Sequence, residues 1–217
     1  MRKINEIFYS LQGEGAHTGV PSVFIRFSGC NLKCGFCDTD HQHGDEMTDE
    51  AIVETVNQYP GEWIVLTGGE PTLWIDSRFV TYLKVMTGKK IAIETNGSRP
   101  VPPEVDWVTV SPKISVEGVE EHELKVERAD ELKVVEVGQD LEGYFHLPCV
   151  VVTANLSCGI STPNLPLGIE ATKMYLQPCF VADPEECRRN RERTVRRVLD
   201  DPRWTLSLQT HRFLGIQ

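Results

Sequence analysis

The chain has 217 residues, 40% of them hydrophobic, and its 22 Lys and Arg against 32 Asp and Glu give a net charge of −10. This composition predicts one globular domain, residues 1–217, which is too short for a complete (β/α) barrel of about 250 residues. The negative charge argues against a nucleic-acid partner, because nonspecific binding requires Lys and Arg, so we expect a small-molecule partner. No run approaches the roughly 18 apolar residues of a membrane helix, and no signal-type segment follows the N-terminus. We therefore expect no membrane partner and a cytoplasmic location.

Strands and helices alternate along the chain. We expect, in order, a strand at 22–27, a helix at 48–59, a strand at 63–67, a helix at 79–86, strands at 91–95, 107–111, 132–137 and 173–177, a helix from 183, and a strand at 204–208. Thr48 and Asp183 are typical N-caps, and Pro60-Gly61 ends the first helix. The apolar runs do not alternate with polar residues, which suits parallel strands covered on both faces.

This order predicts the α/β class and an incomplete (β/α) barrel with a mainly parallel sheet. Residues 138–171 contain Pro148, Pro163 and Pro166. These prolines flank the apolar run Cys149-Val150-Val151-Val152, and we expect the segment 138–171 to leave the barrel as an excursion in the form of a hairpin. Polar residues end most of the strands: Asp38, Thr67, Glu70, Glu94, Ser111, Lys113 and Gln177. Because α/β folds place their sites at the carboxyl edge of the sheet, that edge is the predicted site.

Three of the seven cysteines, Cys30, Cys34 and Cys37, follow the first strand with CxxxCxxC spacing. An odd number of cysteines does not suit a secreted disulfide framework, and clustered thiols in a reducing compartment bind metal. Three thiolates on one loop can hold a 4Fe–4S cluster and leave one iron open. A zinc site completed by His41 or His43 is the alternative.

The surroundings of this loop resemble the radical S-adenosylmethionine (SAM) enzymes. An aromatic residue, Phe36, precedes the third cysteine, and Thr67-Gly68-Gly69-Glu70-Pro71 ends the next strand. The chain is most similar to the 7-carboxy-7-deazaguanine synthase family, through motifs spread over its length: Leu11 to Gly15, Arg26, Cys37-Asp38-Thr39, Ile93 to Gly97, Val110 to Lys113, Glu131 to Val135, Tyr175 to Pro178 and Leu206 to His211.

The resemblance implies a role for each matched residue. It assigns the 4Fe–4S cluster to Cys30, Cys34 and Cys37, and Mg²⁺ to the hydroxyl of Thr39. It assigns SAM to Phe36, Cys37, Asp38, Gly69, Glu94, Ser111, Pro112, Lys113, Gln177 and Pro178. It assigns the pterin substrate to Leu11, Gln12, Gly13, Glu14, Arg26, Thr67, His211 and the terminal carboxylate of Gln217.

Local sequence alone allows other interpretations of these residues. Asp38 or Asp40 would be the expected magnesium ligand, because Mg²⁺ prefers carboxylates. Glu14 and Arg26 are also compatible with ordinary surface charges, and Lys113 with a turn lysine. The arginine-rich helix after Asp183 is interleaved with acidic residues and is expected to be a solvated surface with no assigned function.

The resemblance implies a lyase that contracts 6-carboxy-5,6,7,8-tetrahydropterin to 7-carboxy-7-deazaguanine with loss of ammonia, on the route to queuosine. It also implies the cofactors 4Fe–4S, SAM and Mg²⁺, an electron donor such as flavodoxin or ferredoxin, and a homodimer. A truncated barrel leaves an open side, and the family's use of the chain end predicts that Leu214 to Gln217 fold back to help close it.

Overall fold

Parallel strands make up most of the structure, as the unalternating apolar runs predict. The computed structural model describes residues 1–150 and 172–217, and its strands form one sheet in the order β3-β1-β2-β4-β5-β6-β7-β8-β9. All pairings from β2 to β9 are parallel, whereas β1 runs antiparallel to β2 and β3. The strands are β1 (Arg2–Leu11), β2 (Pro21–Phe27), β3 (Asp45–Met47), β4 (Trp63–Gly68), β5 (Lys90–Thr95), β6 (Trp107–Val110), β7 (Glu131–Glu136), β8 (Lys173–Pro178) and β9 (Thr205–Leu206).

The sheet does not close into a barrel. Within the described residues β3 and β9 are its two edges, and each pairs with one strand only. The predicted incomplete barrel with a mainly parallel sheet is therefore confirmed. None of the helices in residues 1–150 and 172–217 has the length and apolar character needed to cross a membrane.

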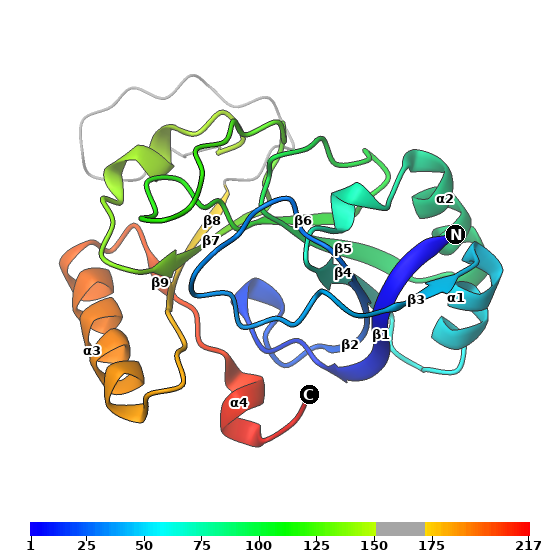
Figure 1. Ribbon diagram of the computed structural model, residues 1–217, viewed down its shortest axis with the longest axis horizontal. Helices are drawn as coiled ribbons and strands as arrows, with labels where there is room; N and C mark the ends of the chain where they lie inside the picture. Colours follow the sequence, from blue (N-terminus) through cyan, green and yellow to red (C-terminus); the bar gives the residue numbers. More distant parts are fainter. Residues whose placement is uncertain (151–171) are drawn as a thin grey trace.

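Helices cover the two ends of the sheet. Figure 1 shows α1 (Asp49–Val56) and α2 (Ser77–Thr87) together at one end and α3 (Pro184–Asp200) at the other. Both predicted N-caps are observed: the Thr48 side chain accepts from the Ala51 amide, and Asp183 accepts from the amides of the first turn of α3. The short α4 (Thr210–Leu214), which the sequence pattern did not predict, lies near the C-terminus below the sheet.

Successive side chains of the central strands enter two different apolar clusters. Ile64 and Leu66 of β4 are fully buried in the main core, together with Phe79 from α2. Val65, between them, belongs to a smaller cluster with Phe24. Because both faces of β4 are covered by apolar side chains, its sequence is a continuous apolar run instead of an alternating one.

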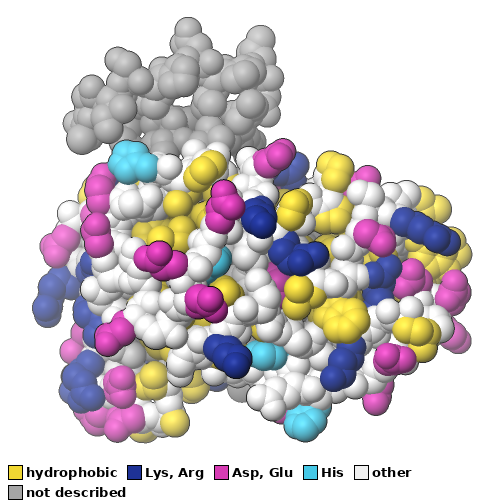
Figure 2. All heavy atoms as spheres, turned by 45° about the horizontal axis from the view of Figure 1, so that its top comes forward, with side chains coloured by type: hydrophobic (Ala, Val, Ile, Leu, Met, Phe, Trp, Pro, Cys, Tyr) yellow, Lys and Arg dark blue, Asp and Glu magenta, His cyan; other side chains and the backbone are white. Residues whose placement is uncertain are grey.

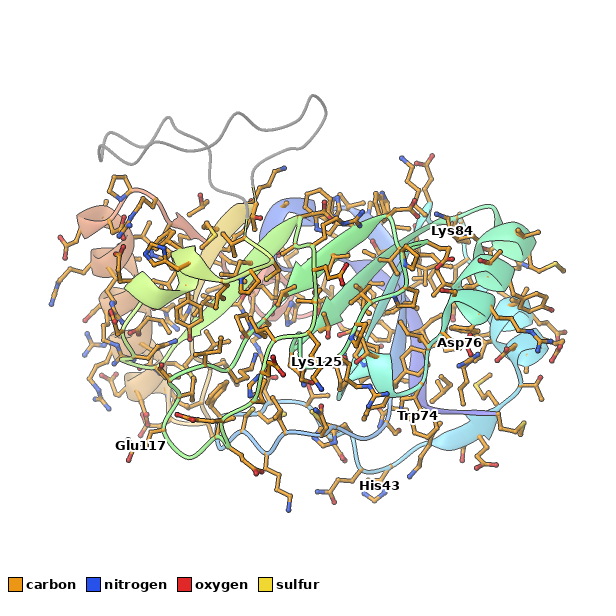
Figure 3. All side chains as sticks on the ribbon, turned by 90° about the horizontal axis from the view of Figure 1, so that it is seen from above. His43, Trp74, Asp76, Lys84, Glu117 and Lys125 are labelled. Atoms are coloured by element: carbon orange, nitrogen blue, oxygen red, sulfur yellow. The ribbon has the colours of Figure 1, made fainter. Side chains whose placement is uncertain are left out.

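The segments without a predicted role contain little regular structure. Residues 111–130 form no helix or strand, and Figure 3 places Glu117 and Lys125 of this segment on the same side of the sheet as His43 of the cysteine loop. After β7, the 3₁₀ helix η3 (Glu142–His146) packs Phe145 against Trp204, with ring centres 5.0 Å apart. Most of the excursion expected at 138–171 falls on residues 151–171, which lie outside the described residues.

The arginine-rich helix α3 differs in part from the predicted solvated surface. Arg188 forms exposed ion pairs along the helix. Arg193 and Arg197, in contrast, both contact the fully buried carboxylate of Glu136 on β7, at 2.6 and 2.7 Å. These two arginines attach α3 to the sheet, because a buried carboxylate requires paired charges and hydrogen bonds.

Candidate active site

One cavity of about 510 Å³ lies at the carboxyl edge of the sheet. Every residue that the sequence assigned to the cluster, SAM, Mg²⁺ or the pterin lines it, with the exception of Pro112. Pro112 is buried beside the cavity wall and not in it. The predicted edge thus brings together side chains that lie as far apart in the sequence as Leu11 and Gln217.

Glu70 is the strand-end residue that does not face this cavity. Its carboxylate is fully buried and accepts four hydrogen bonds: from the amide and the hydroxyl of Thr72 (3.0 and 2.6 Å), the hydroxyl of Thr95 (2.8 Å) and the amide of Asn96 (2.8 Å). Glu70 therefore holds the ends of β4 and β5 together, because its acceptor positions are already occupied by protein donors.

The three cysteines of the loop after β2 all line the cavity. The Leu32 amide donates to Cys30 Sγ at 3.4 Å, and the Cys37 amide donates to the Cys34 carbonyl at 3.1 Å, so the loop is tightly turned. Burial raises the pKa of Cys30 and of Cys34, and the nearby Lys113 charge opposes this shift. The ammonium therefore favours the thiolate form, which is the form that binds metal.

Close contact with the end of β4 shapes this loop. A Cβ at Gly69 would lie 2.0 Å from the carbonyl oxygen of Gly29, so no larger residue fits there. The Gly69 amide donates to Phe27, and the Glu70 amide donates to Gly29 at 2.9 Å. Trp74, labelled in Figure 3, donates from Nε1 to the Ser28 carbonyl at 2.6 Å. The glycine pair thus allows the strand end to support the cysteine loop.

A buried lysine joins two carboxylates in the middle of the cavity. Lys133 of β7 is 5% exposed, and its ammonium donates to Glu94 Oε1 at 3.2 Å and to Glu14. Glu94 also accepts from Gln12 at 3.1 Å and from the Thr67 hydroxyl at 3.0 Å. This arrangement links residues expected at the pterin, Glu14, Gln12 and Thr67, to Glu94, which is expected at SAM.

The pKa shifts follow from this arrangement. Burial alone would raise the pKa of Glu94, but the Lys133 charge and the three hydrogen bonds outweigh it and lower the pKa below its usual range. Burial likewise opposes the charged form of Lys133, but the neighbouring carboxylates Glu14 and Glu94 raise its pKa well above its ordinary value. Both groups are therefore ionised at neutral pH.

Lys113 occupies the cysteine side of the cavity. Its ammonium donates to the carbonyl and the hydroxyl of Ser111, both at 2.7 Å. Burial lowers the pKa of Lys113, while the adjacent Cys34 acts in the opposite direction. Within the described residues its hydrogen-bond partner is the neutral Ser111, so no carboxylate is bonded directly to its ammonium.

The last residue of the chain, Gln217, lines the same cavity. Ser10 Oγ of β1 donates to the main-chain terminal carboxylate oxygen of Gln217 at 2.6 Å, and the Gln217 side chain donates to Glu6. Arg26 Nε donates to the same Glu6 at 2.7 Å. A Cβ at Gly13 would lie 2.1 Å from the His211 ring. The chain end therefore folds back onto β1, as the sequence analysis predicts, and Gln217 lines the cavity.

Comparison with known proteins places this site in a family. The Radical SAM superfamily model matches residues 24–137. The 7-carboxy-7-deazaguanine synthase of Bacteroides thetaiotaomicron is 49% identical over 217 residues, 100% of both chains. The protein of the same name from Neisseria meningitidis is 34% identical over 99% of this chain and 94% of its own length. The chain belongs to the 7-carboxy-7-deazaguanine synthase family.

The fold of a solved structure agrees with this membership. The crystal structure of QueE from Escherichia coli matches with a TM-score of 0.64 and 28% sequence identity, over 95% of this chain and 93% of that chain. Membership of the radical SAM superfamily implies a 4Fe–4S cluster and SAM. It therefore favours the cluster over the zinc site that the cysteine spacing alone also allows. Within residues 1–150 and 172–217, no three His, Cys, Asp or Glu side chains are grouped as ligands of a single metal ion.

The residues present fit the cofactors of a radical SAM family member. Three thiols face one cavity, Lys113 offers a positive charge beside them, and the Gly69 backbone approaches the loop without a side chain between. A cubane cluster needs only three thiolates when its fourth iron binds a ligand. Cys30, Cys34 and Cys37 would hold the cluster, and the surrounding wall has room for SAM.

The polar residues that line the cavity without a role predicted from the sequence include Lys133, Gln209 and Arg212. Lys133 interrupts the apolar run of β7. A lysine in a buried strand indicates a polar site, because its charge needs a carboxylate partner nearby. Gln209 lay within a recognised motif but was given no role. Arg212 carried no sequence signal, because its partner Asp38 lies 174 positions away in the chain.

Proposed function

We propose that this protein is a radical SAM carbon–nitrogen lyase that converts 6-carboxy-5,6,7,8-tetrahydropterin to 7-carboxy-7-deazaguanine with release of ammonia. The observation that carries the proposal is the cavity, where the three cysteines share one space with the residues expected to bind SAM and the pterin. A family relationship over the full length supports it. We propose that residues 1–217 act as a single radical SAM domain.

The cluster and SAM, when bound, would supply the radical chemistry, in which a hydrogen atom is taken from the pterin and returned to it after the rearrangement, so that SAM is regenerated. The residues of this chain bind and orient the two ligands and exclude water. Gln12, Glu14 and Thr67 would orient the pterin, and the network of Lys133 holds these side chains in place. Glu94 would contact SAM from the same network.

The stacked rings of Phe8 and Phe24 form an apolar part of the wall. Their centres are 4.9 Å apart with an interplanar angle of 7°, and both residues line the cavity. Arg26 lies 5.6 Å from the centre of the Phe8 ring and pairs with Glu6. We propose that this wall receives the planar pyrimidine part of the tetrahydropterin and that Arg26 faces its carboxylate.

Mg²⁺ is proposed at Thr39 from the charge and chemistry of the wall. Five lining residues are acidic and four are Lys or Arg, so the cavity does not by itself attract an anionic pterin. Thr39 and Asp40 both line it and offer the oxygen ligands that Mg²⁺ prefers. The Asp38 carboxylate is less available, because Arg212 and Gln209 already donate to it.

We further propose a reducing partner such as flavodoxin or ferredoxin, a homodimer, and a cytoplasmic location. A radical SAM enzyme needs an external electron, and a one-electron carrier supplies it. The homodimer rests on family resemblance, and size-exclusion chromatography with light scattering tests it.

The decisive experiment is anaerobic incubation of the cluster-reconstituted protein with SAM, dithionite, Mg²⁺ and the carboxypterin. We expect 7-carboxy-7-deazaguanine, identified by mass, while SAM is not consumed. The matched control is Cys34→Ser, which keeps the size of the side chain and removes a cluster ligand. Cleavage of SAM by the unchanged protein without formation of the deazaguanine would refute the substrate assignment.

Arg26→Ala tests the placement of the substrate. Removal of the guanidinium leaves Glu6 facing the pterin carboxylate, so the KM for the pterin should rise by roughly tenfold or more, the effect of losing a hydrogen bond to a charged group. SAM affinity should not change. Wild-type affinity for the pterin in this variant would contradict the placement of Arg26.

A further inference from the structure

Two side chains of the C-terminal segment reach the cysteine loop. Arg212 Nη2 lies 2.6 Å from Asp38 Oδ2, and Gln209 Nε2 donates to the same oxygen at 3.2 Å. Asp38 directly follows Cys37. The helix α4, which follows the last strand, is therefore attached to a loop near the beginning of the chain.

Further contacts fix the position of the Arg212 side chain. Its Nε donates to Gln209 Oε1 at 3.0 Å, and its Cζ lies 3.7 Å from the centre of the Phe180 ring. A planar guanidinium can stack on a ring and donate from its edge at the same time, which an ammonium cannot. Arg212 thus connects Asp38, Gln209 and the segment after β8 in one defined geometry.

Gln209 extends this connection to the pterin side. Its Nε2 also donates to Glu14 Oε1 at 2.9 Å, and Glu14 is a partner of Lys133. One amide group therefore bridges two carboxylates, Asp38 on the cysteine loop and Glu14 at the expected pterin site. A carboxylate only accepts hydrogen bonds, so these two groups would not contact each other without a donor between them.

The C-terminal segment itself is anchored at the pterin side. The amide and the hydroxyl of Thr210 both donate to the Gly13 carbonyl at 2.9 Å, and His211 packs over Gly13. Any ligand that orders Gly13, Glu14 and His211 will therefore also order Gln209 and Arg212. Because both side chains donate to Asp38, a ligand that orders them also orders the cysteine loop.

We propose that Gln209 and Arg212 are positioning residues that couple the SAM half of the cavity to the pterin half. The proposal rests on the proposed function, because it takes the pterin and SAM as the two ligands. Each ligand binds more tightly when the other is present, and by linkage the two enhancements are equal. Loss of the Asp38 contacts leaves both half-sites in place but lets them move independently.

The first test measures the cysteine loop without either ligand. Hydrogen exchange is followed by mass spectrometry in the cluster-reconstituted full chain, for the segments 28–42 and 207–217. Arg212→Ala should accelerate exchange in both segments by about fivefold, the upper range expected when local opening is eased by loss of a partly exposed ion pair. Arg188→Ala, at an exposed ion pair on α3, is the matched control and should change neither segment. Unchanged exchange of segment 28–42 in Arg212→Ala would overturn the proposal.

The second test measures coupling directly. The dissociation constant of SAM is determined by equilibrium dialysis with and without the carboxypterin. The value without the pterin divided by the value with it measures the coupling between the two sites. Arg212→Ala and Gln209→Leu should each lower this ratio by about fivefold, while the affinity for SAM alone changes less. A wild-type ratio in both folded variants would overturn the proposal. If the unchanged protein binds no carboxypterin, the proposed function fails, and the exchange experiment still decides whether Arg212 holds the loop.

Discussion

The buried lysine of β7 provides the most direct test of the cavity electrostatics. The Lys133 ammonium lies between Glu14 and Glu94 and is almost inaccessible to solvent. Lys133→Met keeps the length and much of the apolar volume of the side chain and removes its charge. Both carboxylates, whose side chains are 13% and 24% exposed, would then lose their counter-charge in a largely buried position.

The size of the effect follows from the remaining partners. Removal of one member of a buried ion pair costs about 3–5 kcal/mol. Glu94 keeps hydrogen bonds from Gln12 and Thr67, and Glu14 keeps two amide donors, so we expect a loss near the lower end. At roughly 2–4 °C per kcal/mol for a chain of this size, about 3 kcal/mol lowers the Tm by about 6–12 °C.

The loss of stability should depend on pH in a specific direction. In the wild type the lowered pKa of Glu94 contributes stability above its unfolded pKa, and this contribution is lost as the pH falls through the folded pKa. In Lys133→Met, burial without a counter-charge raises that pKa. A raised carboxyl pKa contributes stability below the unfolded value, which is lost as the pH rises through the folded one. The difference in Tm between variant and wild type should therefore be larger at pH 8 than at pH 5.5.

Lys84→Met is the matched control for this experiment. Lys84 Nζ lies 2.7 Å from Asp106, but both side chains are 32% exposed, so the pair should contribute at most about 1 kcal/mol. Differential scanning fluorimetry of both variants at the two pH values measures the effect. A Lys133→Met protein no less stable than Lys84→Met, or one whose deficit does not change with pH, would refute the electrostatic reasoning.

Three further predictions concern the loop, the chain end and a helix cap. Gly69→Ala places a Cβ against the Gly29 carbonyl, so we expect the loop to shift and the iron content after reconstitution to fall; full iron content would contradict this. Residues added after Gln217 displace its contact with Ser10, and we expect the KM for the pterin to rise roughly tenfold, whereas an N-terminal tag of equal length should have no effect. Thr48→Ala removes the cap of α1 and should cost about 1 kcal/mol in unfolding experiments without affecting turnover; a loss of activity would show that α1 influences the site.

The central sheet could be predicted because its burial is uniform. Strands such as β4 and β5 insert side chains into apolar clusters on both faces, so their sequences are continuous apolar runs. The carboxyl ends of these strands meet at one edge, so the polar residues after each run identify the cavity wall without any knowledge of contacts. Glu70 is the exception, because its neighbour Thr72 supplies donors that turn it into a structural residue.

The first and last elements of the chain could not be predicted in this way. Only Ile4 of β1 is fully buried, and the remaining residues are partly exposed, so the strand shows neither an apolar run nor a clean alternation. The strand forms through antiparallel pairing with β2, and such a pairing between two separate segments cannot be read from the local pattern of either one. The short α4 depends likewise on Thr210 contacting Gly13, 197 positions away.

The charges of the cavity support a final prediction about the metal. Arg26 is paired with Glu6, Lys133 with Glu14 and Glu94, and Arg212 with Asp38, so three of the four cavity cations are already neutralised. In the described part of the chain, Lys113 donates hydrogen bonds only to Ser111, and it lies beside Cys34 and Cys30, where we propose that it faces SAM and the cluster.

We therefore expect the pterin carboxylate to need another positive charge, and Mg²⁺ at Thr39 is the proposed source, because Thr39 and its neighbour Asp40 offer suitable oxygen ligands. Removal of Mg²⁺ by a chelator should lower kcat/KM for the pterin by about two orders of magnitude, as expected when several kcal/mol of charge stabilisation are lost. SAM affinity, measured without pterin, should not change. Thr39→Val, which keeps the shape and removes the hydroxyl, should raise the Mg²⁺ concentration needed for half-maximal activity. If the enzyme is fully active after metal removal, Arg26 must meet the pterin carboxylate alone and Glu6 must move away from it.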